Sequence, residues 1–553
     1  MLRDCTVQPL LTDFYQFTMA YAYWKCGKEE TNAVFELYFR ENPLGGEFTI
    51  FAGLQDCLLF LSKFQLTEED VKYLQSVLPP TTEQGFYDYL RNINTSTVTL
   101  RAMPEGSVVF PKVALLEVEG PLAIVQILET PLLTLVNYAS LVATNAARFR
   151  LAAGSGKRLL EMGLRRAQGP DGGVSASKYS YIGGFDGTSN VLAGKLYGIP
   201  LFGSMAHSYV TSFISMSEVK VQTLKPASGG QPAVDFVSLC EKWLVRVCRL
   251  LHMSQDQINS SELAAFISYA VTYPGNFIAL VDTYNVMRSG VPNFCAVSLA
   301  LHEMGYRTHG LRLDSGDLVQ QSLKIRHTLQ ACAEEFKVSW FSDIPIIISN
   351  GISEKDLINL QNQRHEVDSI GVGTNLVTCP LQPSLGCVYK LTQVCGKARI
   401  KLTEDKEKMT LPGKKTAYRL YGLDGSPFLD LLTLGDEPAP RAGEEIRCHV
   451  LNRRDDCLQV TAARVETLHR VYYQHGQISE GLCTSSEIKS HAQNSLTNLH
   501  PKHKHLQDPV PYQVAISLKL CDLLNDLTKE SKPVSEAPNE PIASQLPVDV
   551  NGL

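Results

Sequence analysis

Three aspartates in the middle of the chain follow short apolar runs, where carboxylates can bind a metal ion, a ribose or a developing positive charge. Asp282 follows Phe277-Ile-Ala-Leu-Val281, and Asp314 and Asp317 belong to the segment Arg312-Leu-Asp-Ser-Gly-Asp317. Oxygen ligands of this kind suit Mg²⁺ and stabilise cationic centres. A single aspartate at a strand end could equally cap the following helix. Two of them with an arginine two residues before Asp314 favour a binding site.

Arg312 and Asp314 have the same parity, so on a strand both side chains would point to one face. Such a pair could match an anionic group and a cationic centre at neighbouring points of one ligand. The alternative is a buried structural ion pair.

Two further segments have residue types that suit phosphate chemistry. His207, in Gly203-Ser-Met-Ala-His-Ser208, could act as a base, a ligand or a phosphoryl acceptor, although a lone histidine is usually none of these. Gly371-Val-Gly373-Thr374 offers backbone N–H groups and a hydroxyl that suit the terminal phosphate of a sugar phosphate. A plain tight turn would have the same sequence.

The cations between Lys401 and Lys415 could bind a polyphosphate, although charge runs usually face solvent. No P-loop motif is present, because Lys408 stands where its first glycine would be needed. Tyr15 lies in an amphipathic first helix, where an aromatic ring could stack on a flat ligand or pack in the core.

The middle of the chain repeats a short buried-strand run followed by a helix-like stretch. The five runs are 199–203, 277–281, 308–313, 344–349 and 367–371. Alternation of this kind predicts a parallel sheet, and active groups at the carboxyl ends of its strands are typical of a (β/α) barrel. Because a complete barrel needs eight strands, this one is incomplete or has strands too weak to see. Helical spacing between Glu129 and Ala167 predicts long helices that end at Leu159-Leu-Glu-Met-Gly163.

The pattern predicts an α/β protein with an irregular or open (β/α) barrel, an α/β sandwich domain and a helical C-terminal region. The expected parts are an N-terminal portion of the sandwich (1–135), a barrel-like catalytic domain (136–385), returning strands that complete the sandwich with a basic loop (386–480), the helical region (481–530) and a disordered tail (531–553).

Composition is that of an ordinary globular protein, with 44% hydrophobic and 20% charged residues. The net charge is −6 and the cations are dispersed, which argues against nucleic acid or a membrane as a partner. The fourteen cysteines include no C-x-x-C pair, so we interpret them as reduced thiols rather than zinc ligands. No apolar signal core follows Met1, which predicts a cytosolic location.

Seven motifs together resemble nicotinate phosphoribosyltransferases of the animal type in order and spacing. They are Leu11-Thr-Asp-Phe-Tyr-Gln-x-Thr-Met19, Phe35-Glu-Leu-Tyr-Phe-Arg40, Glu161-Met-Gly-Leu-Arg-Arg166, Gly184-Phe-Asp-Gly-Thr-Ser-Asn190, Ala206-His-Ser208, Arg312-Leu-Asp-Ser-Gly-Asp317 and Gly371-Val-Gly-Thr374. The similarity extends from about Pro9 to about Tyr512.

The resemblance implies a type II phosphoribosyltransferase, a homodimer whose active sites are completed across the subunit interface. The implied reaction joins nicotinate to 5-phosphoribosyl 1-pyrophosphate and gives nicotinate mononucleotide and pyrophosphate. It requires Mg²⁺, for which Mn²⁺ can substitute, and is coupled to hydrolysis of ATP as a co-substrate. It is the first step of NAD synthesis from nicotinic acid.

The resemblance also implies a role for each matching residue. The nicotinate-binding residues would be Arg312 and Ser204 on the carboxylate, Tyr15 stacked on the pyridine ring from the neighbouring subunit, and Arg165 and Ser189 nearby. The sugar donor would be bound by Gly373 and Thr374 at its 5′-phosphate and by Arg40 and Lys401 near the pyrophosphate. Asp282 and Asp314 would serve the ribose, the metal and the oxocarbenium-like transition state, and ATP would phosphorylate His207.

Two departures from the family pattern concern the base pocket. Ser204 stands where the animal enzymes often have threonine, and Met162 replaces a phenylalanine that many relatives have. The nearest alternative activity is that of nicotinamide phosphoribosyltransferases, which have an aspartate where this chain has Ser189. An aspartate accepts from an amide but repels a carboxylate, so Ser189 and Asn190 favour nicotinate. A non-catalytic signalling protein on the same fold is a second alternative, and the intact His207 argues against it.

Overall fold

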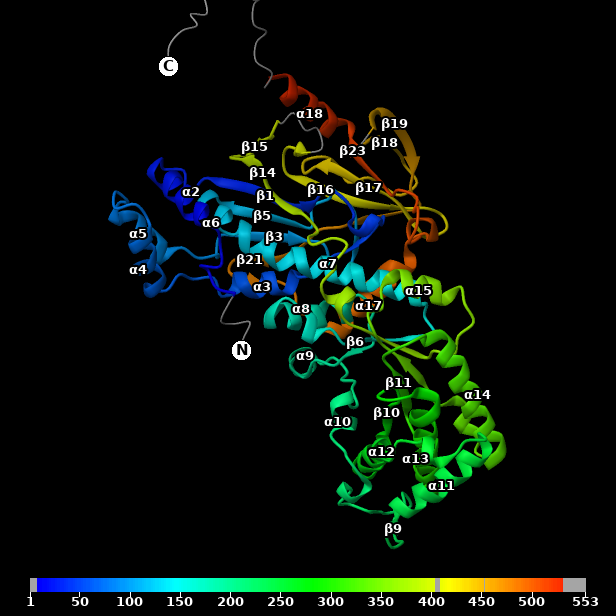
Figure 1. Cartoon of the computed structure of the whole chain (residues 1–553). Coiled ribbons are helices and arrows are strands. Elements are labelled where there is room, and N and C mark those ends of the chain that lie inside the picture. Colours follow the sequence, from blue (N-terminus) through cyan, green and yellow to red (C-terminus); the bar gives the residue numbers. More distant parts are fainter. Residues whose placement is uncertain (1–6, 403–407, 452, 531–553) are drawn as a thin grey trace, which may run out of the picture.

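The computed structural model describes residues 7–402, 408–451 and 453–530. A mainly antiparallel sandwich, built from both ends of the chain, lies next to a parallel sheet with its helices, built from the middle (Figure 1). The predicted disordered tail, 531–553, lies outside the described residues.

Two sheets form the sandwich. The first has the order β15 (Lys397–Ala398), β14 (Cys387–Val394), β1 (Asn32–Phe39), β5 (Leu116–Pro121), β3 (Thr99–Ala102), β21 (Arg470–Gln474) and β22 (Gln477–Ile478). The second has the order β19 (Arg453–Thr461), β18 (Glu445–Val450), β23 (Gln513–Ser517), β17 (Pro427–Leu434), β16 (Lys415–Tyr421) and β20 (Arg464–Thr467). Because β14 pairs with β1, the chain returns to its N-terminal sheet after the middle part, as the sequence predicted.

The sandwich strands are buried on both faces where they are central. Seven of the eight residues of β1 are buried, so this strand is covered on both faces, and Glu36 is the one charged residue in it. The region predicted as helical, 481–530, has α17 (Ser485–Asn498) and α18 (Leu518–Glu530), but it also has β23, which pairs in parallel with β17. With five residues, of which only Val514 and Ile516 are β-branched, β23 was too short to recognise.

The parallel sheet has the order β10 (Ile278–Leu280), β11 (Gly310–Leu313), β12 (Ile346–Ile348), β13 (Ser369–Val372), β6 (Arg158–Glu161) and β7 (Gly187–Thr188). Among the described residues β10 and β7 do not pair, so the ring is a half-barrel with six strands rather than eight. Four of the five predicted runs are strands, whereas 199–203 contributes only a bridge between Leu201 and Thr188.

The helices that cover the parallel sheet follow the predicted alternation. They are α8 (Gly169–Ile182), α9 (Val191–Tyr197), α11 (Phe236–Leu250), α12 (Ser260–Thr272), α13 (Val291–Glu303), α14 (Leu318–Phe336) and α15 (Glu354–Gln361). In α11 the buried residues Phe236, Cys240, Trp243 and Val247 recur every three or four positions, which gives the helix one apolar face.

One prediction in this region is wrong. Residues 159–163 are not the end of a helix: α7 (Glu129–Ala153) ends earlier, Gly154 adopts φ 75°, and 158–161 form β6. The two leucines of β6 happen to continue the helical spacing of α7. The glycines at 154 and 156 were the signal that separated the two elements.

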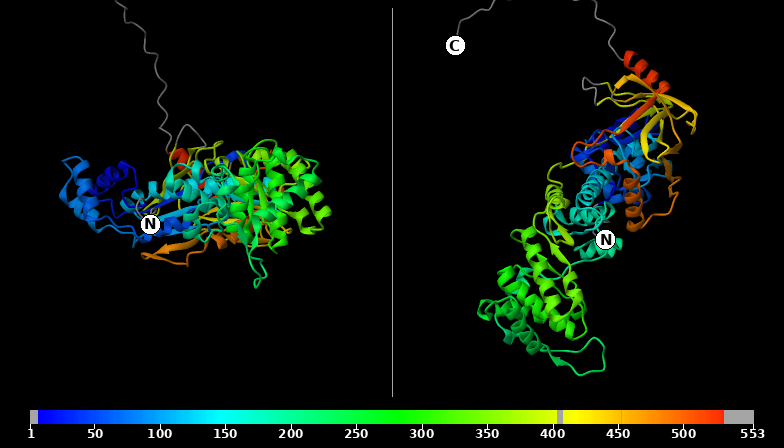
Figure 2. Two further views of the ribbon diagram at one scale, coloured as in Figure 1. Left: turned by 60° about the horizontal axis from the view of Figure 1, so that its bottom comes forward. Right: turned by 90° about the vertical axis from the view of Figure 1, so that its right-hand side faces the viewer.

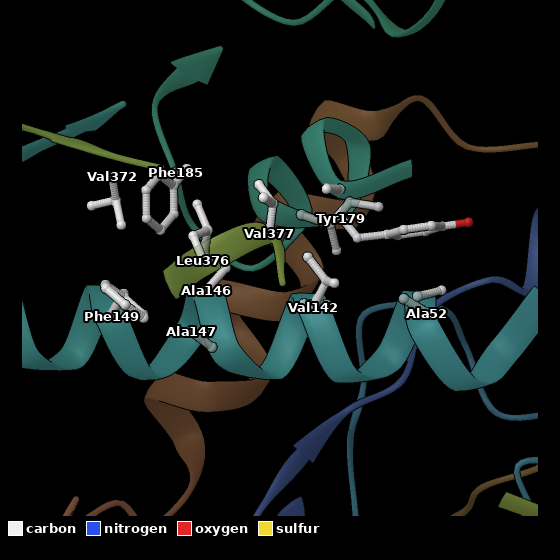
Figure 3. Close-up of a cluster of buried hydrophobic side chains, with 14 of the residues drawn as sticks. Ala52, Val142, Ala146, Ala147, Phe149, Tyr179, Phe185, Val372, Leu376 and Val377 are labelled. Atoms are coloured by element: carbon white, nitrogen blue, oxygen red, sulfur yellow. The ribbon is translucent and has the colours of Figure 1, made fainter. Parts of the chain in front are cut away.

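Helix α7 joins the sandwich to the half-barrel. With α6 (Leu122–Ile127) it is long and apolar enough to cross a membrane, but 67% of its most apolar window is buried inside the protein, as in a core helix. Figure 3 shows Val142, Ala146 and Phe149 of α7 facing Tyr179 of α8 and Leu376 and Val377 of α16 (Thr374–Val377). This contact fixes the end of β13 against the sandwich.

Candidate active site

The carboxyl edge of the parallel sheet brings most of the predicted site residues together. Following the strand order, the edge carries Asp282 after β10, Asp314 after β11, Gly373 and Thr374 after β13, Arg165 after β6, Ser189 after β7, and then Ser204 and His207. Strands in parallel present their carboxyl ends at one edge, so residues far apart in sequence become neighbours.

The two central aspartates have different surroundings. Asp282 Oδ2 accepts from the backbone N–H of Asp314 at 3.0 Å and from the Ser315 hydroxyl at 2.5 Å. Asp282 Oδ1 is buried and has no hydrogen-bond partner. Asp314 Oδ1 accepts from the Ser349 hydroxyl at 2.6 Å. A buried carboxylate oxygen without a partner costs free energy unless a ligand binds it. The third aspartate, Asp317, caps α14 by accepting from the N–H of Gln320, so the capping interpretation holds for this residue alone.

His207 begins α10 (His207–Thr211) and faces both carboxylates. Its Nε2 lies 3.9 Å from Asp282 Oδ1 and 3.8 Å from Asp314 Oδ2, and its Nδ1 lies 3.1 Å from the Thr283 hydroxyl. Its side chain is 41% exposed. Two carboxylates beside Nε2 favour the tautomer with the proton on that nitrogen, which leaves the lone pair on Nδ1.

Arg312 faces a cavity of about 380 Å³ that Ser204, Phe202 and Met162 also line. One Nη donates to the Met205 carbonyl at 3.3 Å, and Nε is buried without a partner. Within the described residues its guanidinium makes no ion pair, so the structural ion-pair alternative is wrong.

The electrostatic surroundings of Arg312 include charges of both signs. Burial lowers the pKa of Arg312, the charges of Asp314 and Asp282 oppose that effect, and nearby Arg165 adds to it. An anionic ligand would relieve the repulsion between the two guanidinium groups and satisfy the unpartnered Nε.

Small residues allow the loops after β6 and β13 to approach closely. A side chain at Gly371 would lie 2.6 Å from the sulfur of Met162, and one at Gly163 would lie 2.4 Å from the side chain of Val377. Gly373 and the exposed Thr374 then begin α16 beside these loops. Met162 lines the cavity, so its thioether occupies the wall for which a phenylalanine was expected.

Ser189 is exposed at this edge, whereas Asn190 is 2% exposed. The Asn190 side chain caps α9 by accepting from the N–H of Ala193 and also donates to the Ser177 hydroxyl at 3.1 Å. Of the two residues expected to select the base, only Ser189 can therefore meet a ligand.

The remaining predicted residues lie together on the sandwich instead. The hydroxyl of Tyr15, in α2 (Phe14–Lys25), donates to Glu129 at 3.3 Å. Lys390 of β14 is close enough to Glu129, Arg40 and Lys401 to feel their charges. Burial lowers the pKa of Lys390, the charge of Glu129 raises it, and the charges of Arg40 and Lys401 lower it. These residues thus form a second cluster on the sandwich. Figures 1 and 2 show the blue N-terminal segment with α2 and β1 away from the green segment with β10 and β11.

The basic loop is smaller than the sequence indicated. Lys415 is buried and pairs with Glu36 at 3.1 Å, and Lys414 pairs with Glu119 at 2.5 Å. Both lysines therefore stabilise the sandwich, while Lys401 remains exposed. Residues 403–407 of the loop lie outside the described residues.

Three residues of the site were missed from the sequence. Thr283, Ser315 and Ser349 each bond directly to His207, Asp282 or Asp314. Their positions in the sequence could have indicated them, because each lies within one or two residues of a strand end or of a predicted aspartate.

Family comparisons cover almost the whole chain. The model of the nicotinate phosphoribosyltransferase (NAPRTase) family matches residues 158–419, and those of its N-terminal and C-terminal domains match 10–137 and 414–524. The chain is 53% identical to nicotinate phosphoribosyltransferase of Homo sapiens over 95% of this chain and 98% of the human one. It is 50% identical to nicotinate phosphoribosyltransferase 2 of Arabidopsis thaliana over 96% of each. The crystal structure of human nicotinic acid phosphoribosyltransferase matches with a TM-score of 0.86 and 50% identity, over 93% of this chain and 99% of that one.

Proposed function

The chain belongs to the nicotinate phosphoribosyltransferase family and is an enzyme with that activity, and we propose how its residues divide the work. In the reaction the ring nitrogen of nicotinate bonds to C1 of the ribose while the bond from C1 to pyrophosphate breaks. The observation that carries the proposal is the convergence of Arg312, Asp282, Asp314 and His207 at one sheet edge.

Arg312 and Ser204 bind the nicotinate carboxylate in the cavity between them. A guanidinium can donate two parallel hydrogen bonds to a carboxylate, and the buried Nε of Arg312 has no other partner. Arg165 and Ser189 approach the same base from the two neighbouring loops. Nicotinamide, the alternative substrate, lacks the negative charge that would offset the repulsion between Arg312 and Arg165.

Asp282 and Asp314 face the ribose. As pyrophosphate departs, C1 becomes cationic, and carboxylates held in place beforehand stabilise that state more than the neutral donor. The unpartnered Asp282 Oδ1 fits either a ribose hydroxyl or a metal ion. No group of three or more metal-ligating side chains occurs in the described part of the chain. Two carboxylates still suit Mg²⁺, or Mn²⁺ in its place, because Mg²⁺ is commonly bound by one or two carboxylates and by substrate phosphates. When bound, the metal would neutralise charge on the pyrophosphate.

Gly373 and Thr374 bind the 5′-phosphate of the sugar through backbone N–H groups and the threonine hydroxyl. Both are accessible at the start of α16, and the loop that carries them is held by the packing of Leu376 and Val377 on α7. A rigid loop with exposed N–H groups is a suitable anion site.

His207 accepts the γ-phosphoryl group of ATP, a role that couples ATP hydrolysis to the reaction. Because the two carboxylates near Nε2 favour a proton on that nitrogen, Nδ1 is the nucleophile, and the bond between the γ-phosphorus and ADP breaks as the N–P bond forms. Water later cleaves the N–P bond. The phosphorylated side chain would lie beside both aspartates and alter how they hold the sugar donor.

A second subunit completes the site in this proposal. Tyr15, Arg40 and Lys401 lie on the sandwich rather than at the edge of their own parallel sheet. In a twofold dimer each subunit could offer this cluster to the other, with the tyrosine ring on the pyridine and the cations on the pyrophosphate.

Mixing Tyr15→Ala and Asp314→Asn subunits, each inactive alone, should restore roughly a quarter of the sites. Random pairing of equal amounts makes half of the dimers mixed, and each mixed dimer has one intact site of two. Mixtures that stay inactive despite subunit exchange would exclude the shared site.

The product, nicotinate mononucleotide, makes this reaction the first step from nicotinic acid towards NAD. Every cysteine in the described residues is a free thiol, which supports a reducing, cytosolic location.

Purified protein with nicotinate or nicotinamide, each with phosphoribosyl pyrophosphate and with or without ATP, tests the proposal. We expect nicotinate mononucleotide and pyrophosphate from nicotinate, faster with ATP, and transient acid-labile phosphate on His207 when the γ-phosphate is labelled. Equal rates with and without ATP would exclude the coupling.

A further inference from the structure

Glu161, the last residue of β6, has a buried carboxylate that the reaction as described does not use. Its side chain is 1% exposed. Oε1 accepts from the backbone N–H of Gly163, and Oε2 accepts from the hydroxyls of Ser177 at 2.8 Å and Thr188 at 2.5 Å. A buried carboxylate with three donors is firmly held, and it holds its donors equally firmly.

Two of the three donors belong to the loops that carry proposed nicotinate ligands. Gly163 directly precedes the short helical turn Leu164–Arg166, which contains Arg165. Thr188 precedes Ser189, whose backbone N–H donates to the carbonyl of Glu161 at 2.9 Å. The third donor, Ser177, lies in the middle of α8, and its hydroxyl also accepts from the side chain of Asn190, the residue after Ser189.

The like charges of Arg165 and Arg312 oppose each other at this edge, and the Glu161 bonds act against that repulsion. Arg165 is close enough to Arg312 to lower the pKa of its guanidinium, so the two cations repel each other before nicotinate binds. An untethered loop would move Arg165 away from the base, and a displacement of about 1 Å can reduce catalytic efficiency roughly hundredfold.

We propose that Glu161 is a positioning residue that sets the affinity for nicotinate, because its carboxylate fixes the loops of Arg165 and Ser189 relative to Arg312. The inference rests on the proposed roles of these three residues. Glu161 itself does not touch the substrate, and its effect should appear in the binding of the base rather than of the sugar donor.

Two matched variants separate positioning from general stabilisation. Thr188→Val removes a hydroxyl from Oε2 of Glu161, next to a base-binding loop. Ser517→Ala, in β23 of the sandwich, removes a hydroxyl from the carboxylate of Glu437 and is the matched control away from both loops. We expect Thr188→Val to raise KM for nicotinate roughly tenfold and to leave KM for phosphoribosyl pyrophosphate within about twofold. Ser517→Ala should leave both KM values within about twofold even if it lowers the melting temperature.

Substitution of Glu161 itself gives an independent readout. In Glu161→Gln the remaining carbonyl oxygen can still accept from the Gly163 N–H, and the amide can donate to the two hydroxyls, which are free to rotate. This variant should therefore keep most of the wild-type affinity for nicotinate. Glu161→Ala should lose it. If the glutamine variant binds nicotinate no better than the alanine variant, the anchoring role is wrong.

The outcome also distinguishes this inference from the proposed site. Equal KM changes in Thr188→Val and Ser517→Ala, or none in either, would overturn the role of Glu161. If Arg312→Ala measured in parallel still raises KM for nicotinate, only the Glu161 inference fails. If Arg312→Ala also leaves that KM unchanged, the base site itself is misassigned.

Discussion

Replacement of Arg312 by alanine should reduce kcat/KM for nicotinate by about two orders of magnitude. The guanidinium is largely buried, it has one hydrogen bond of 3.3 Å to Met205, and its Nε has no partner, so the nicotinate carboxylate would be its main polar contact. Loss of one partner from a buried charged pair costs about 3 kcal/mol, which is roughly a hundredfold at about 1.4 kcal/mol for each factor of ten. Asp282 and Asp314 would also repel the substrate once the arginine is gone.

The assay is steady-state turnover of nicotinate at saturating phosphoribosyl pyrophosphate. Arg312→Lys is the matched control, since it keeps the charge but not the two parallel donors, and it should lie between alanine and the wild type. Turnover of nicotinamide should change much less than turnover of nicotinate. The melting temperature should not fall, because burial already disfavours the charged form of this side chain. A change in kcat/KM smaller than threefold would refute the assignment of Arg312 to the carboxylate.

Three other predictions concern ATP coupling, the sandwich core and pH. His207→Ala should lose the stimulation by ATP and keep a slow basal rate, whereas an equal loss of both rates would contradict the phosphohistidine. Asp430→Asn should lower the melting temperature by several degrees, because the buried Arg419 would lose its counter-charge and one of its two 2.8 Å hydrogen bonds at a cost of about 3–5 kcal/mol; Asp436→Asn, in an exposed pair, is the control and should change little. Burial raises the pKa of Glu262 from 4.5 to about 7, so ionisation of this carboxyl should destabilise the fold progressively between those pH values, by up to roughly 3 kcal/mol. Glu262→Gln should flatten that decline in thermal melts, and a decline equal to that of the wild type would show that another group is responsible.

The sequence identified most of the half-barrel because strand ends and polar residues coincide there. Asp282, Asp314 and His207 each follow an apolar run, and the parallel sheet brings such positions to one edge. Periodicity failed where two elements share it: the leucines of β6 extend the spacing of α7, and only the intervening glycines separate them. Strands of two residues, such as β7, have no periodicity at all.

Residue type alone could not assign individual roles within the site. Asp317 and Asp314 are three residues apart and chemically identical, yet one caps α14 and the other faces His207. Lys415 looked like part of a phosphate-binding loop, but its partner, Glu36, is nearly four hundred residues away. Such choices depend on which groups the fold places within about 3 Å, and that is a property of the tertiary structure.

The most direct test of the site is a crystal structure of the protein with nicotinate mononucleotide and Mg²⁺. The account predicts that the pyridine carboxylate lies on Arg312 and Ser204, that a ribose hydroxyl or the metal contacts Asp282 Oδ1, and that the 5′-phosphate lies on Gly373 and Thr374. A nucleotide bound with its carboxylate away from Arg312, or its ribose away from both aspartates, would contradict it.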